Sequence, residues 1–156
     1  TDFSSREDFD QALTERVLSI EPDLVVLAGF MRILTTQFTS AFAGKLINIH
    51  PSLLPEYPGL NTHKQALENG DLMHGATIHY VDEGLDSGPI IAQGALKIDP
   101  SQSEAKLAQR IHKIEHALLP KVIAEIAKEL ISLKGKEVKF ESKSYFGKNN
   151  MEFFNV

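Results

Sequence analysis

The sequence contains no cysteine among its 156 residues, which excludes disulfide bonds, a thiolate nucleophile and cysteine-ligated zinc within this chain. No apolar run approaches the ~20 residues that a membrane-spanning helix needs. The first eighteen residues are too acidic and too polar for a signal peptide. We therefore expect a cytoplasmic protein without a membrane partner.

Clustered positive charge is also missing, because the formal net charge is -5 and the lysines and arginines are scattered. This pattern argues against a nucleic-acid partner and favours small-molecule partners. The proportions of hydrophobic (42%) and charged (24%) residues are those of an ordinary globular protein. At this length we expect residues 1–156 to form a single domain.

Apolar patterning in the first third of the chain predicts strands that alternate with helices. Residues 4–20 begin with a serine N-cap candidate and predict an amphipathic helix. The continuous apolar runs at 23–30 and 45–50 are typical of strands covered on both faces, and a short helix is expected between them. Strands alternating with helices predict parallel βαβ units. The expected apolar face of the first helix consists of Phe9, Leu13, Val17 and Ile20.

The remaining sequence predicts a mixed sheet with a long helix. Residues 62–70 suggest a short helix, 75–81 alternate like a half-buried strand, and 89–98 suggest another strand. The segment 101–130 predicts a helix that Pro120 kinks or divides. Residues 136–142 suggest a short edge strand, and the tail to Val156 has no clear period. The expected apolar stripe of the long helix consists of Leu107, Ile111, Ile114, Leu118 and Val122.

Asn48 and His50 place polar chemistry at the end of an otherwise apolar strand. Residues two apart in a strand point to the same side, so these side chains project together. Pro51 ends strand pairing, which puts both near the carboxyl end of a parallel strand, where open α/β sheets bind ligands. An amide can donate to a developing oxyanion, and an imidazole can carry a proton or stabilise negative charge. Acyl or formyl transfer to an amine requires both capabilities.

The glycine-rich segment 82–89 supplies a candidate carboxylate for this pair. Asp86 beside His50 would orient the imidazole and favour its cationic form by opposite-charge attraction. The residues alone leave another interpretation open, since an asparagine and a histidine at a strand end are often hydrogen-bonded caps.

Other histidines raise the question of a metal. Residues 112–116, His-Lys-Ile-Glu-His, match the H-x-x-E-H pattern of some zinc proteases. That site needs a third ligand, and no histidine follows His116, so we expect no metal site. His63, His74 and His79 are dispersed over loops and a strand, which favours solvated or packing histidines.

Two stretches carry a resemblance to a known family: "KLINIHPSLLPEYPGLNTHKQALENG" and "HGATIHYVDEGLDSGPIIAQ". Together with "LAGFMRIL" and "EH" they resemble the folate-dependent formyltransferases, and within them the phosphoribosylglycinamide formyltransferases of purine biosynthesis. Methionyl-tRNA formyltransferases resemble the first stretch, and formyltetrahydrofolate deformylases the second, so both remain alternatives. "YPGLNTHKQAL" favours the glycinamide ribonucleotide branch. A Rossmann-like binding remnant without activity is a further alternative, which the joint presence of Asn48, His50 and Asp86 disfavours.

The resemblance implies a Rossmann-like α/β fold with a mostly parallel mixed sheet and flanking helices. It implies transfer of a formyl group from 10-formyltetrahydrofolate to glycinamide ribonucleotide without a metal, by a monomer or weak homodimer. Asn48, His50 and Asp86 would be catalytic, and Leu54-Pro55 would be a cis peptide. The folate site would consist of Arg6, Met31, Arg32, Ile33, Leu34, Asn48, Asp82, Glu83, Gly84, Leu85 and Asp86. The ribonucleotide site would consist of Ile49, Pro51, Gly59, His112 and Glu115, although some family members have glutamine at the position of His112.

The sequence departs from the family pattern at its start. Family members begin with a strand and a glycine-rich loop whose backbone N–H groups bind the substrate phosphate, whereas this chain begins at Thr1 without an initiator methionine. We expect an N-terminally truncated chain that lacks roughly 60 residues, or about two βα units. On this interpretation the chain holds two thirds or more of the family domain, with a tail from about residue 137.

Overall fold

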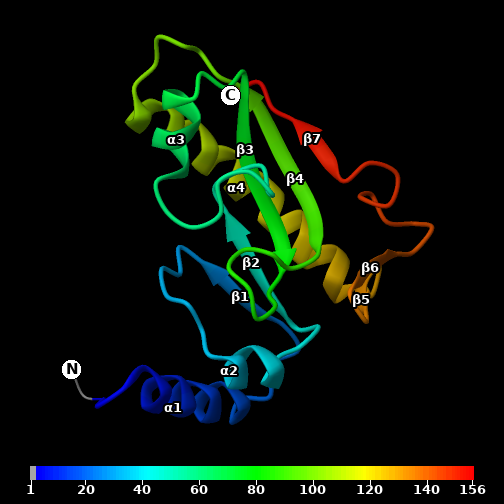
Figure 1. Ribbon diagram of the computed structural model, residues 1–156. Helices are drawn as coiled ribbons and strands as arrows, with labels where there is room; N and C mark the ends of the chain where they lie inside the picture. Colours follow the sequence, from blue (N-terminus) through cyan, green and yellow to red (C-terminus); the bar gives the residue numbers. More distant parts are fainter. Residues whose placement is uncertain (1–2) are drawn as a thin grey trace.

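A computed structural model describes residues 3–156 (Figure 1). Eleven helices and strands alternate along the first half of the chain and become mostly strands toward its end. In chain order they are α1 (Arg6–Leu18), β1 (Val25–Ala28), α2 (Thr36–Ala41), β2 (Leu46–His50), α3 (Thr62–Glu68), β3 (Met73–Tyr80), β4 (Ile90–Lys97), α4 (Glu104–Ala127), β5 (Ile131–Lys134), β6 (Glu137–Phe140) and β7 (Met151–Phe153).

Five strands form the central sheet in the order β1-β2-β3-β4-β7. The pairs β1–β2 and β4–β7 are parallel, whereas β2–β3 and β3–β4 are antiparallel. Helices flank this mixed sheet, so the predicted α/β class is confirmed. The predicted parallel β-α-β unit is also present, with α2 between β1 and β2.

One face of the sheet packs against α4, which runs behind β3 and β4 in Figure 1. The predicted stripe is confirmed, because its five residues are the buried residues of α4. They join Ile47, Ile49 and Ile78 of the sheet in one apolar cluster. Pro120 does not divide the helix, which continues for 24 residues. No helix within residues 3–156 is long and apolar enough to cross a membrane.

The helices α1 and α2 lie beside the β1 end of the sheet (Figure 1). Phe38, Phe42 and Leu46 form a second apolar cluster there. The prediction of α1 is confirmed, with Ser5 as its N-cap, but its fully buried residues are the polar Asp10 and Thr14. Leu13 and Val17 are only partly buried against the cluster, and Ile20 follows the helix end and is 67% exposed.

Two predictions of strand burial were wrong. Strand β1 was expected to be covered on both faces, yet it is half-buried, because within the described residues it pairs only with β2 at the sheet edge. Strand β3 was expected to be half-buried, yet seven of its eight residues are buried, since it lies at the centre of the sheet between β2 and β4.

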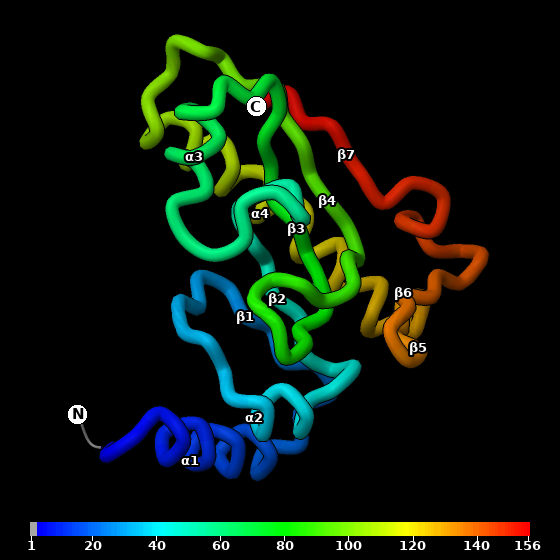
Figure 2. The backbone as a smooth tube through the Cα atoms, in the orientation of Figure 1, coloured from blue at the N-terminus to red at the C-terminus, as the bar shows by residue number. Residues whose placement is uncertain are grey.

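The end of the chain contains strands that its sequence did not reveal. Strand β6 confirms the predicted strand near residue 137, but it pairs with β5 in a separate two-stranded sheet. Strand β7 adds to the free edge of β4 through Met151–Phe153. Figure 2 shows this C-terminal segment running along β4, far from the N-terminal helix at the other end of the molecule.

Candidate active site

The polar pair at the end of β2 lies on the sheet face opposite α4. Ile47 and Ile49 alternate with Asn48 and His50 along the strand and enter the α4 cluster, as predicted. The antiparallel register places His79 opposite Asn48 and Thr77 opposite His50. We call the face that carries Asn48, His50, Thr77 and His79 the site face.

Asp86 lies in the β3–β4 loop and contacts three of these side chains, those of Asn48, His50 and His79. Its Oδ2 is 3.4 Å from His50 Nδ1, and its Oδ1 is 3.6 Å from His79 Nε2. Asn48 Nδ2 donates to Oδ1 at 3.4 Å, and the backbone N–H of Gly59 donates to Oδ2 at 2.8 Å. One carboxylate therefore contacts two imidazoles, an amide and a backbone donor.

The environment of Asp86 holds its carboxyl group in the charged form. Burial by itself would raise the pKa of Asp86, but the hydrogen bonds from His79 and Gly59 and the charges of both imidazoles lower it more, so the net pKa lies below the ordinary value. The residue also has a positive φ of 49°, an uncommon backbone conformation for a non-glycine residue. An ionised aspartate with a strained backbone in a loop beside the sheet is typical of functional sites.

Both ring nitrogens of His50 face oxygen atoms. Nε2 lies 2.8 Å from the carbonyl oxygen of Tyr57, while Nδ1 faces Asp86. His79 is held similarly, with Nδ1 2.8 Å from the Tyr80 carbonyl and Nε2 3.3 Å from Asn48 Nδ2. Because a carbonyl oxygen only accepts, the Tyr57 contact fixes an N–H at His50 Nε2, the Tyr80 contact fixes one at His79 Nδ1, and each contact orients its ring.

The loop after His50 is held by side chains of β3 and β4. Thr77 Oγ1 donates to the Ser52 carbonyl at 2.7 Å and accepts from the Leu54 N–H at 3.0 Å. Gln93 Nε2 donates to the Leu54 carbonyl at 2.9 Å. The Leu54-Pro55 peptide is cis, which confirms that prediction. This loop carries the Tyr57 carbonyl and the Gly59 N–H to the site.

The residues expected to bind folate lie in three regions of the structure: around Asp86, after β1, and at the start of α1. Asp86 and Asn48 contact each other, and the preceding loop is an exposed turn in which Asp82 accepts from the Gly84 N–H and the Ser87 hydroxyl. A second segment, 31–34, follows β1, and Met31 is 74% exposed there. Arg6 lies at the start of α1 beside Glu7, and no described contact joins it to Asn48, His50 or Asp86. The exposed-loop members are Asp82, Glu83, Gly84 and Leu85, and those after β1 are Met31, Arg32, Ile33 and Leu34.

The residues expected to bind the ribonucleotide divide between the site loop and α4. Gly59 contacts Asp86 directly, and Pro51 follows His50, whereas Ile49 is buried in the α4 cluster. Glu115 is half-buried on α4, and burial raises its pKa against the opposing charges of His112 and His116. His112 is exposed on the same helix. His63 lies on α3, which packs against α4, and burial together with the charges of His112 and His50 lowers its pKa.

The other histidines are not simply dispersed. His63 Nδ1 lies 3.0 Å from His74 Nε2, and burial lowers the pKa of His74 to about 4. His79 belongs to the site rather than to solvent or packing alone, which corrects its predicted role. Among residues 3–156, no three His, Asp or Glu side chains are grouped so that they could hold a metal ion.

Sequence reasoning missed His79, Thr77 and Gln93. The alternation of 75–81 carries the signal that Thr77 and His79 share a face. What the sequence does not contain is the register that sets His79 against Asn48, or the β4 pairing that brings Gln93 to Thr77.

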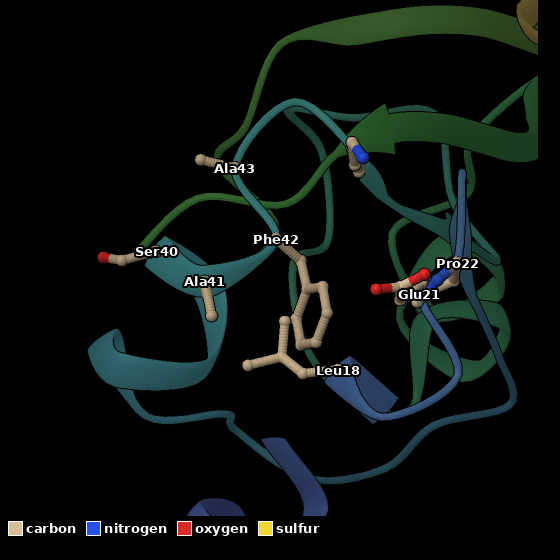
Figure 3. Close-up of a pocket in the computed structure, with 8 residues that line it drawn as sticks. Leu18, Glu21, Pro22, Ser40, Ala41, Phe42 and Ala43 are labelled. Carbon is tan, nitrogen blue, oxygen red and sulfur yellow. The ribbon is translucent and has the colours of Figure 1, made fainter. Parts of the chain in front are cut away.

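A separate hollow of about 480 Å³ lies at the opposite ends of β1 and β2 (Figure 3). It is lined by residues that precede these strands, including Leu18, Glu21, Pro22, Phe42 and Lys45. None of the expected site residues lines it, so the chemistry described above lies elsewhere in the molecule.

Similarity to known proteins agrees with this geometry. Phosphoribosylglycinamide formyltransferase of Escherichia coli (strain K12) is 51% identical over 125 residues, which are 80% of this chain and 59% of that protein. The structure of phosphoribosylglycinamide formyltransferase from Coxiella burnetii superimposes with a TM-score of 0.87 at 40% identity, covering 99% of this chain and 72% of that one. A formyltetrahydrofolate deformylase from Pseudomonas syringae is more distant, at 31% identity and a TM-score of 0.77 over 83% of this chain and 44% of that one.

The chain thus spans about 59% of the length of the Escherichia coli enzyme. The sequence pattern of the family described as Formyl transferase matches residues 1–123, which is more than half of the chain. These residues include the whole sheet except β7, together with Asn48, His50, His79 and Asp86. The chain belongs to the formyl transferase family.

Proposed function

We propose that the protein transfers a formyl group from 10-formyltetrahydrofolate to the amine of glycinamide ribonucleotide. The observation that carries the proposal is the contact of Asp86 with Asn48, His50 and His79 at the carboxyl end of β2. The 51% identity to the Escherichia coli enzyme of that name supports the choice of substrates.

The chemistry follows from the charges that develop. When the amine attacks the formyl carbon, negative charge grows on the formyl oxygen, and a donor amide and a cationic ring stabilise it. Asn48 supplies the amide, and His50 supplies the ring, since both of its nitrogens face acceptors. Asp86, ionised in the folded protein, stabilises that cation.

Proton transfer completes the reaction. The amine loses a proton, and the departing nitrogen of tetrahydrofolate gains one as its bond to the formyl carbon breaks. His50 is the proposed general acid and base, with water as the carrier between the two nitrogens. Holding both substrates beside the same ring removes the entropic cost of bringing them together during the reaction.

The two substrates would bind on opposite sides of His50. We assign the pteridine ring to segment 31–34 and the 82–86 loop, with Arg6 near its acidic tail. We assign the ribonucleotide to Ile49, Pro51 and Gly59, with Glu115 and His112 on α4. The half-buried Glu115 supports this assignment, since a carboxylate beside a ribose or an amine accepts hydrogen bonds.

The test is a comparison of acceptors with the full-length protein. With 10-formyltetrahydrofolate as donor, tetrahydrofolate should form only when glycinamide ribonucleotide is present, and methionyl-tRNA should not replace it. The net charge of -5 is unsuited to binding tRNA, which supports this expectation. Comparable transfer to both acceptors would contradict the proposal.

The deformylase is a second candidate, favoured by the similarity to the Pseudomonas syringae protein. A deformylase transfers the formyl group to water, so formate would appear without any amine acceptor. Release of formate at the same rate with and without glycinamide ribonucleotide would support this candidate instead.

A further inference from the structure

The inner face of α1 carries a buried carboxylate where an apolar side chain would suffice for packing. Asp10 is 1% exposed, and its neighbour one turn along, Thr14, is also buried. Burying a charge is costly unless it is paired, and replacing a buried ion pair by apolar residues is often neutral or stabilising. A role for the charge itself therefore needs a structural reason.

That reason lies in the segment between β1 and α2. Asp10 Oδ2 accepts a hydrogen bond of 2.7 Å from the backbone N–H of Thr35, and Oδ1 lies 3.9 Å from Arg32 Nη2. Within the described residues Oδ1 has no hydrogen-bonding partner, so Arg32 is the charge that faces it. Thr35 in turn is the N-cap of α2.

Arg32 is held a second time by α1. Its guanidinium carbon lies 4.0 Å from the centre of the Phe9 ring, a cation–π geometry. Asp10 and Phe9 are neighbours in α1, so the helix holds both the charge and the planar face of this side chain. Segment 31–35 is thus fixed at Arg32 and at Thr35.

The residues between these two points are the ones a ligand would meet. Met31 and Ile33 are 74% and 59% exposed, while Leu34 packs on the cluster of Phe38 and Phe42. An exposed segment that lines a pocket through its backbone needs fixed backbone positions, because its hydrogen bonds are lost when it shifts.

We propose that Asp10 is a positioning residue that fixes segment 31–35 for binding of the folate cosubstrate. It touches no substrate and acts through Arg32 and the Thr35 amide. The inference rests on the proposed function for the identity of the ligand, whereas the fixing of the segment stands on the contacts above.

The test compares Asp10→Asn with Thr14→Val. The asparagine oxygen can still accept from Thr35, but the attraction to Arg32 is lost. Thr14→Val alters the same buried helix face, yet among the hydrogen bonds of residues 3–156 the Thr14 hydroxyl donates only within α1, to the Asp10 carbonyl. Both variants would lower the melting temperature, and only the first would release the segment. Arg32→Gln removes the other partner of the Asp10–Arg32 ion pair. The Arg32 side chain is 45% exposed, so this change leaves the buried face of α1 unaltered.

Two measurements separate positioning from stability. Trypsin cleavage after Arg32 should be about tenfold faster in Asp10→Asn than in the wild type, the effect of losing one charge-assisted contact. Cleavage after the exposed Lys136 serves as the internal control and should not change. Binding of 5-formyltetrahydrofolate should weaken by about the same factor in Asp10→Asn and in Arg32→Gln, and stay within about twofold in Thr14→Val.

The outcomes are distinguishable. Equal cleavage after Arg32 and equal folate binding in Asp10→Asn and the wild type would overturn the inference and leave the proposed function intact. Weaker binding in Thr14→Val to the same degree would also overturn it, because the effect would then come from stability. Absence of folate binding by the wild-type protein would overturn the proposed function, and the positioning role with it.

Discussion

The two faces of the central sheet are built from different chemistry. The face toward α4 presents Ile47, Ile49 and Ile78, which join the buried stripe of α4 in one apolar cluster. The site face presents Asn48, His50, Thr77 and His79, whose polar atoms bond to one another and to loops. Because side chains alternate along a strand, the same strands supply both faces.

This division separates stability from chemistry. On the α4 face each apolar side chain stabilises the fold because it is buried away from water. Its volume and shape therefore matter most there. On the site face each polar group is fixed by a partner, and a substitution there leaves that partner unpaired. Changes on the α4 face should therefore alter the free energy of unfolding, and changes at Asp86 should alter turnover.

The largest expected loss of stability comes from Ile114→Ala on the α4 face. Ile114 is fully buried and packs against Gly94 of β4. Its truncation should lower the free energy of unfolding by about 2–5 kcal/mol, measured by urea denaturation. Turnover per folded molecule should be unchanged. The exposed neighbour Lys113 provides the control, since Lys113→Ala should change stability by less than about 0.5 kcal/mol. Equal losses of unfolding free energy in Ile114→Ala and Lys113→Ala would contradict the assignment of stability to the buried α4 face.

His74 should make the folded protein sensitive to acid. Its pKa is about 4 in the folded protein because it is buried, against an ordinary value of 6.5. Below pH 6.5 the unfolded chain therefore binds a proton that the folded protein does not, and stability falls as the pH drops toward 4. The loss attributable to His74 should approach about 3 kcal/mol.

The substitution His74→Asn should remove most of the pH dependence of the free energy of unfolding between pH 7 and pH 4. The measurement is urea denaturation at a series of pH values. His63→Asn should act in the same direction but less, since burial also lowers the pKa of His63. An unchanged pH profile in His74→Asn would show that this buried ring does not control acid unfolding.

A smaller effect is expected at Gly94, where α4 meets the sheet. A Cβ there would lie 2.3 Å from Ile114 Cγ2, so Gly94→Ala should overpack the contact and cost about 1–3 kcal/mol. Combining it with Ile114→Ala should cost less than the sum of the two changes, because the second removes the atom that clashes. If the two losses of unfolding free energy were strictly additive in the double variant, the cost of Gly94→Ala would not come from its contact with Ile114.

The sequence predicted the α4 face well because that face depends on local periodicity. The stripe from Leu107 to Val122 is visible in the spacing of apolar residues, and all five of its members are buried. The short strand β7 was invisible, because its position against β4 comes from a tertiary contact and not from its own pattern.

The site was predicted in part for the same reason. Asn48 and His50 follow from the alternation of one strand, and Asp86 was proposed from the resemblance as well as from its loop. His79 was missed because only the β2–β3 register sets it against Asn48. The polar inner face of α1 was missed because the partners of Asp10 are distant in sequence. Asp10 pairs with Arg32 and accepts a hydrogen bond from the Thr35 N–H.

Asp86→Asn in the full-length protein tests the proposed site most directly. The asparagine oxygen can still accept from the Gly59 N–H, so the free energy of unfolding at neutral pH should change by less than about 1 kcal/mol. Its charge no longer stabilises a cationic His50, so turnover with glycinamide ribonucleotide should fall by about 10²-fold or more. The decisive measurement is turnover per folded molecule of Asp86→Asn relative to the wild type, with Asp99→Asn on an exposed turn as the control. A fall of that size in Asp86→Asn alone is the predicted result, and normal turnover in a fully folded Asp86→Asn protein would contradict the proposed role of Asn48, His50 and Asp86 in catalysis.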